Sequence, residues 1–265
     1  MHTLTSKDGT RIAFDRVGNG HPVILVSGAT ADRRSNASLA DALAADFTVL
    51  NYDRRGRGES GDTLPYALER EFEDIAALIA DAGGSAHLYG ISSGGGLALE
   101  AAAAGLPIDR LAVYEVPYNL SPDQPRIQRE YLDGLNAFLA QGRRGDMAAL
   151  FLRTVGMPEE AIEQFRNTPD WAGMEAVAPT LPYDAMSLGD GTPNAERLGR
   201  ITAPTCAITG DPEGEHEVGS AEFFEAAAMA IVEHVPTAEH RRLPGQTHMV
   251  DPAALAPVLT GFYTG

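Results

Sequence analysis

The chain has 265 residues, of which 44% are hydrophobic and 22% are charged, ordinary proportions for a globular protein. It carries 20 Lys and Arg against 37 Asp and Glu, and the resulting formal net charge of −17 disfavours nucleic acids and anionic membranes as partners. The single cysteine, Cys206, cannot form an internal disulfide and has no Cys or His at metal-ligand spacing, so we expect a reducing compartment and no metal there.

The first ten residues lack the basic segment and apolar stretch of a secretory signal. The longest apolar region, residues 97–104, is too short to cross a bilayer and contains Glu100. We therefore expect a cytoplasmic protein that acts on a small molecule, without nucleic-acid or membrane partners. A homodimer is compatible with this reading.

Apolar runs typical of β-strands alternate with helical segments rich in alanine and leucine. The opening pair of strands flanks a hairpin signal at Asp8-Gly9, and the later runs are apolar throughout, as in parallel strands covered on both faces. The pattern predicts an α/β fold with a mostly parallel eight-stranded sheet and helices on both faces. The predicted strands are 3–6, 11–17, 22–26, 47–52, 86–89, 111–114, 205–209 and 240–243, and the main helices are 35–45, 68–82, 95–104, 222–232 and a last one from residue 252.

The alternation stops between residues 117 and 200, where helical segments are interrupted by prolines and glycines and no convincing strand occurs. We interpret residues 1–116 and 201–265 as the core domain and residues 117–200 as a helical cap, inserted after the sixth strand and lying over the strand ends. Many large apolar residues in this insertion, Tyr118 and Trp171 among them, predict a mainly hydrophobic pocket beneath the cap.

Residues 90–94 read G-I-S-S-G, a G-x-S-x-G motif that follows an apolar strand and opens a helix. In that context the motif is typical of a nucleophile elbow, in which a tight turn projects the serine, here Ser92, from the sheet edge. Glycine is expected on both flanks because a Cβ there would clash in so tight a turn. The elbow predicts nucleophilic catalysis by Ser92.

This elbow, D-R-R-G-R-G-E-S at residues 53–60 and G-Q-T-H at residues 245–248 together resemble the α/β-hydrolase superfamily, in the family's order and over essentially the whole chain. The resemblance implies the α/β-hydrolase fold with its helical cap. It also implies a Ser–His–acid triad in the chain order serine, acid, histidine.

A serine hydroxyl needs a base to remove its proton, and imidazole suits this task because it titrates near neutral pH. Of the seven histidines, His248 lies in the loop after the last predicted strand, where the family's base is found. We read His87 and His240 as strand residues and His216 as solvent-exposed.

Acyl transfer also needs two backbone N–H donors aimed at the developing oxyanion. One is expected from Ser93, the residue after the nucleophile, and the other from Ala29, because Gly28 lets the preceding loop curl. Many family members have H-G here, whereas this chain has S-G-A-T at residues 27–30. The residues expected to contact substrate are Gly28, Thr30, Tyr118, Trp171 and Met249.

Two carboxylates are candidates for the acid of the triad. Glu213 follows the seventh strand, the common family position, but stands in an acidic run typical of a solvated loop. Glu115 closes the apolar sixth strand and resembles the acid of the zearalenone-type lactone hydrolases. A carboxylate there is costly to bury without a partner, which an imidazole N–H would supply, so we favour Glu115. We expect the arginines after the predicted strand 47–52, Arg54, Arg55 and Arg57, to pair with Asp53 and Glu59.

These features predict a serine hydrolase that cleaves an ester or lactone of a small, mostly apolar substrate through an acyl-enzyme on Ser92, with no metal or organic cofactor. The same fold supports other uses. The alternatives are a cofactor-free, haloperoxidase-like perhydrolase and a non-hydrolytic tailoring cyclase or ligand-binding protein.

Overall fold

The computed structural model describes residues 1–211 and 219–265. Within these residues, eight strands form one sheet in the order β1-β2-β4-β3-β5-β6-β7-β8. Only the pairs made by β2 are antiparallel, and all the others are parallel, which confirms the predicted fold class. The strands are β1 (His2–Thr5), β2 (Arg11–Val17), β3 (His21–Val26), β4 (Phe47–Tyr52), β5 (Ala86–Ile91), β6 (Ile108–Tyr114), β7 (Thr205–Asp211) and β8 (Ala238–Pro244).

Successive side chains of the central strands enter two different cores, because neighbouring residues of a strand point to opposite faces of the sheet. In β3, Ile24 and Val26 join the core on one face, whereas Val23 and Leu25 join the core on the other. Both faces of the sheet are therefore buried, which explains why the sequences of these strands are uninterrupted apolar runs.

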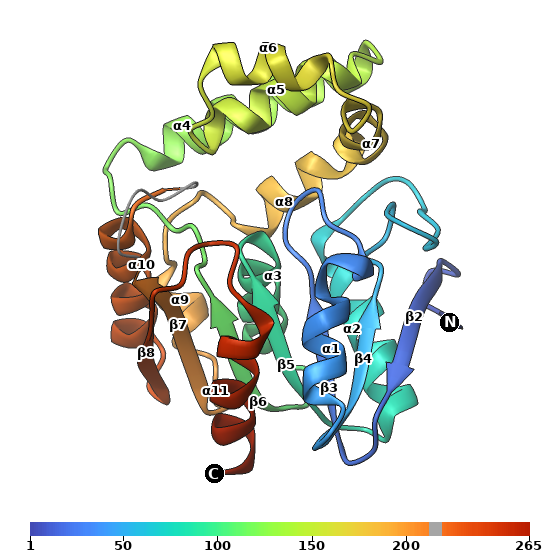
Figure 1. The fold of residues 1–265 in the computed structure, drawn as a ribbon, viewed down its shortest axis with the longest axis vertical. Helices are drawn as coiled ribbons and strands as arrows, with labels where there is room; N and C mark the ends of the chain where they lie inside the picture. Colours follow the sequence, from blue (N-terminus) through green and yellow to red (C-terminus); the bar gives the residue numbers. More distant parts are fainter. Residues whose placement is uncertain (212–218) are drawn as a thin grey trace.

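Helices cover each face of the sheet (Figure 1). The α1 (Ala37–Leu43) and α11 (Pro252–Thr264) helices pack together on one face, and α2 (Leu68–Ala82), α3 (Ser93–Ala103) and α10 (Ala221–His234) cover the other. The short α9 (Ala195–Leu198) packs beside α3 and α10. Helix α3 begins two residues before the predicted position, because the glycine run after Ser92 continues the helix instead of forming a turn.

Between β6 and β7 the chain is helical, and Figure 1 shows α4, α5 and α6 as a layer beyond the end of the sheet. This layer has its own buried cluster, which includes Leu135, Met147 and Trp171. None of the helices that the structure describes is long and apolar enough to cross a membrane. The helices of this segment are α4 (Gln124–Ala140), α5 (Arg144–Thr154), α6 (Glu159–Arg166), α7 (Trp171–Val177) and α8 (Leu181–Ser187).

Candidate active site

Ser92 lies between the end of β5 and the start of α3, in a left-handed backbone conformation with φ 56° and ψ −128°. A Cβ at Gly90 would lie 2.4 Å from the Gly94 carbonyl oxygen, and a Cβ at Gly94 would lie 2.4 Å from the Ser27 carbonyl oxygen. Glycine is thus required on both flanks of the turn. The strained bend leaves the Ser92 side chain half-buried at the sheet edge.

Glu115 follows β6 and is also in the left-handed region, with φ 46°. Its side chain is fully buried, but both carboxylate oxygens have partners. Oε1 accepts a hydrogen bond from the N–H of Gly210 at 2.9 Å, and Oε2 lies 2.8 Å from Nδ1 of His248. These contacts compensate the cost of burying the carboxylate.

His248 is held by contacts on three sides. Its ring stacks on Phe224, with centroids 5.1 Å apart, and its Nδ1 faces Glu115. The preceding loop is fixed by the Tyr114 hydroxyl, which donates to the Thr247 carbonyl oxygen at 2.6 Å. A carboxylate at Nδ1 selects the tautomer with a proton on that nitrogen, so Nε2 of a neutral ring is left as a proton acceptor.

Ser92 and Glu115 lie on neighbouring strands, and the Ser92 N–H donates to the Tyr114 carbonyl oxygen at 2.9 Å. Among the described residues other than glycine, positive φ values occur only at Thr30, Ser92 and Glu115, which follow β3, β5 and β6. These strands are adjacent in the sheet. The strained positions thus gather at the carboxyl edge of the parallel strands, where open α/β sheets bind ligands.

The loop after β3 lies against Ser92, since a Cβ at Gly28 would be 3.1 Å from the Ser92 Cβ. The Gly28 carbonyl oxygen accepts a hydrogen bond from Nη1 of Arg57 at 2.6 Å. In a planar trans peptide the N–H points opposite to the carbonyl, so the N–H of Ala29 is directed away from Arg57. Ser93 opens α3, where N–H groups have no acceptor within the helix.

Asp184, from α8, connects the arginines to the elbow. Its Oδ1 accepts from Arg54 at 2.7 Å and from the Ser93 hydroxyl at 2.9 Å, and its Oδ2 accepts from Arg57 at 2.6 Å. Arg54 also forms an ion pair with Glu71 of α2. A single buried carboxylate therefore joins α8, the elbow and the loop that carries Gly28.

The arginine partners expected from the sequence are wrong. The Asp53 and Glu59 carboxylates bind Arg33, whereas Arg54 and Arg57 bind Asp184. Arg55 binds two more distant carboxylates, Asp8 and Asp74. The physical reason is that the turn after β4 points these side chains into the protein, where carboxylates from other elements meet them.

Burial by itself would raise the pKa of Asp184, but the charges of Arg57 and Arg54 outweigh that effect and hold the pKa below its usual range. The carboxylate therefore stays charged at neutral pH. Charged carboxylates accept stronger hydrogen bonds than neutral ones, which favours a rigid attachment of α8 to the elbow.

The remaining residues singled out from the sequence lie in several environments. The Thr30 hydroxyl donates to the Ala29 carbonyl oxygen at 2.6 Å. Tyr118 is buried in the core that contains α2 and α3, and Trp171 is buried in the cluster of the helical segment 124–187. Met249 is 75% exposed beside His248. Glu213 and His216 lie outside the described residues.

Sequence reasoning missed Asp184 and Phe224, which contact the Ser93 hydroxyl and the His248 ring. Both stand within helical patterns that give no local indication of a functional role. The aspartate is 130 residues from Arg54 in the chain, so only the folded structure brings the pair together.

A model of the alpha/beta hydrolase family matches residues 23–258. The chain therefore belongs to the alpha/beta hydrolase family, as the elbow and the sheet predicted. Family and fold place it among the hydrolases.

Similar proteins of known structure include an alpha/beta hydrolase from Sphaerobacter thermophilus, 47% identical with a TM-score of 0.85, which covers 99% of this chain and 100% of that one. An enol-lactonase from Burkholderia xenovorans shares the fold, with a TM-score of 0.71 and 18% identity over 100% of both chains. The N-formylmaleamate deformylase of Pseudomonas putida is 38% identical over 117 residues, which span 42% of this chain and 44% of that relative.

The buried ion pairs of Asp184 lead to a prediction about stability. Replacing Asp184 with Asn leaves Arg54 and Arg57 with less charge compensation, so we expect a loss of about 3 kcal/mol in the free energy of unfolding. Urea denaturation followed by circular dichroism measures it. The exposed Asp190, a few residues further along the chain, is the matched control, and D190N should stay within about 0.5 kcal/mol. A D184N variant as stable as the parent protein would contradict this account.

The lowered pKa of Asp184 makes its contribution depend on pH. A carboxylate with a depressed pKa in the folded state stabilises the protein above its unfolded pKa of about 3.9, and this stabilisation disappears as the pH falls through the folded value. The difference in unfolding free energy between the parent and D184N should therefore be constant near neutrality and shrink below about pH 4. Urea titrations at pH 7 and pH 3 test this, and a difference that grows in acid would refute it.

Proposed function

We propose that this protein is a serine hydrolase that cleaves an ester or lactone of a small, mostly apolar substrate through an acyl-enzyme. The observation that carries the proposal is the 2.8 Å contact between the buried Glu115 carboxylate and Nδ1 of His248, at the sheet edge where Ser92 occupies a strained turn. Glu115, rather than Glu213, is then the acid of the triad.

In this mechanism, Ser92 Oγ attacks the substrate carbonyl while Nε2 of His248 accepts the hydroxyl proton. Glu115 holds the imidazole tautomer and stabilises the imidazolium that forms. The N–H groups of Ala29 and Ser93 stabilise the oxyanion of the tetrahedral intermediate. The imidazolium then protonates the leaving alcohol, and a water molecule, activated by His248, hydrolyses the acyl-enzyme. No step draws on a metal or an organic cofactor.

The helical segment after β6 supports an apolar substrate. Ala29 packs against its hydrophobic cluster, so apolar side chains reach the loop of the proposed oxyanion donor. We propose that residues 117–200 act as a cap over a core of residues 1–116 and 201–265, with Gly28, Thr30, Tyr118, Trp171 and Met249 as the substrate-contact candidates. Cytoplasmic location and homodimer formation stay predictions from the sequence.

A second candidate substrate class is an N-formyl amide. The local 38% identity to N-formylmaleamate deformylase favours it. The same acyl-transfer steps apply, with His248 protonating a leaving nitrogen instead of an oxygen. Parallel assays with nitrophenyl acetate and an N-formyl amide separate the two classes.

Replacing Ser92 with Ala removes the nucleophile, so turnover of nitrophenyl esters should fall by at least about a thousandfold. A fluorophosphonate probe should label the parent stoichiometrically at Ser92 and leave S92A unlabelled, as measured by intact-protein mass spectrometry. Ser38, exposed on α1, gives the matched control, and S38A should react like the parent. Full ester turnover in folded S92A would exclude the acyl-enzyme. A parent that binds ligands without labelling would favour the non-covalent class.

Replacing Glu115 with Gln preserves its shape but puts an amide where the Nδ1 proton needs an acceptor. We expect kcat to fall by about three to four orders of magnitude, with a smaller change in KM, because the wrong imidazole tautomer is favoured. The opposing variant is Glu213→Gln, which should retain activity close to that of the parent. The reverse result, with E213Q inactive and E115Q active, would assign the triad acid to Glu213.

A further inference from the structure

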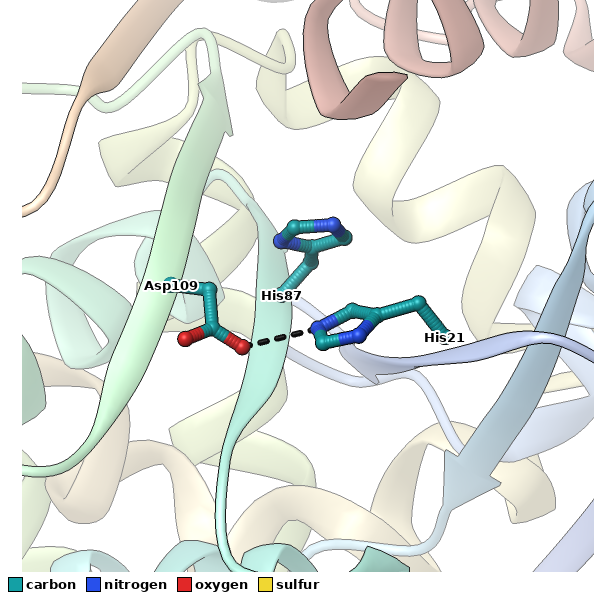
Figure 2. Close-up of side chains that lie close together, drawn as sticks. All are labelled: His21, His87 and Asp109. Atoms are coloured by element: carbon teal, nitrogen blue, oxygen red, sulfur yellow. Dashed lines mark hydrogen bonds and ion pairs between the residues drawn. The ribbon is translucent and has the colours of Figure 1, made fainter.

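His21, His87 and Asp109 meet at the end of the sheet opposite to Ser92. They come from β3, β5 and β6, which are neighbours in the sheet, and His21 and Asp109 lie at or next to the start of their strands (Figure 2). His21 Nε2 is 2.7 Å from Asp109 Oδ2, and the two imidazole centroids are 4.4 Å apart. One potential ligand atom from each of the three side chains lies within 4.8 Å of the others.

A β-bulge between β5 and β6 brings the His87 and Asp109 side chains together. Ala86 pairs with Ile108 and Leu88 pairs with Leu111, so one residue of β5, His87, opposes both Asp109 and Arg110 of β6. Ile108 and Leu111 both point into the core that contains α2 and α3, and the extra residue lets Asp109 and His87 share the opposite side. Bulges commonly re-aim side chains for function.

His87 has an unsatisfied polar atom. It is 6% exposed, and its Nδ1 has no hydrogen-bond partner among the described residues. Its ring is held in place by stacking on Tyr263, with centroids 4.5 Å apart. The unpaired Nδ1 is a nitrogen atom that could coordinate a metal ion.

We propose that His21, His87 and Asp109 form a binding site for a divalent cation of the Zn²⁺ type. Two imidazoles and a carboxylate are a common ligand set for zinc, with the fourth position open to water. Bonds of about 2.0–2.1 Å in a tetrahedron place ligand atoms roughly 3.3 Å apart, so small side-chain rotations complete the site. His21 and Asp109 are 44% and 38% exposed, which permits both these rotations and entry of the ion.

The net charge of the whole protein favours a cation, although Arg110 adjoins the site. The protein carries a net charge of −17, which raises the local concentration of cations. Arg110 is the nearest opposing charge along the chain, and its guanidinium lies over the Phe262 ring at 5.5 Å. A bound ion would link the amino ends of β3, β5 and β6. The site lies at the end of the sheet opposite to Ser92, so it is separate from the reaction proposed for that residue. It was not expected from the sequence, because its ligands are 66 and 22 residues apart in the chain, far from any short metal motif.

The test uses the full chain after treatment with EDTA and dialysis. Isothermal titration with Zn²⁺ should show one site per chain with a micromolar dissociation constant. A hundredfold excess over that constant should raise the midpoint of thermal unfolding by about 5 °C. Replacing Zn²⁺ with Co²⁺ should produce the intense visible absorption bands of a tetrahedral site.

The two exposed ligands provide variants that leave the core intact. His21→Gln and Asp109→Asn should each weaken Zn²⁺ binding by at least tenfold and remove the Co²⁺ bands. His2→Gln, an exposed position on the edge strand β1, which is separated from β3 by β2 and β4, should bind like the parent. Absence of one-site binding by the parent would overturn the proposal, and so would equal binding by the parent and both variants. Ester turnover by the EDTA-treated protein is the independent readout for Ser92.

Discussion

The hydrogen bond from Arg57 to the Gly28 carbonyl oxygen is the interaction on which the placement of the loop beside Ser92 depends. It orients a single peptide unit beside Ser92 and directs the Ala29 N–H away from the arginine. A buried guanidinium needs a counter-ion, and Asp184 supplies it. Because Asp184 also accepts from the Ser93 hydroxyl, α8 is coupled to the turn at Ser92 through one carboxylate.

The two ends of the sheet position their side chains by different means. At the carboxyl edge, Ser92 and Glu115 hold left-handed backbone conformations, which cost about 1–3 kcal/mol each and persist only because the surrounding pairing determines them. At the amino edge, an extra residue in β6 turns Asp109 toward His87 without a strained dihedral angle. The strained turns and the β-bulge both depend on the rigidity of a parallel sheet that is buried on both faces.

Much of the fold could be predicted because its signals are local. The apolar runs identified the strands, and the elbow glycines were recognised by the clash that any Cβ would cause. The preference for Glu115 came from the cost of burying a carboxylate, and its contact with His248 supports that preference. The arginine partners could not be predicted, since charge pairing by sequence proximity selected Asp53 and Glu59, which bind Arg33 instead.

The sequence by itself determined the alternation of strands and helices and the turn at Ser92, because periodicity and steric exclusion act between residues that are close in the chain. The tertiary structure alone decided that Asp184 joins Arg54 and Arg57, and that His21, His87 and Asp109 meet. These groups lie on separate elements, and their contacts depend on strand order, on a one-residue bulge and on the packing of α8. Local propensity encodes none of these, since each arises only when distant segments are packed together.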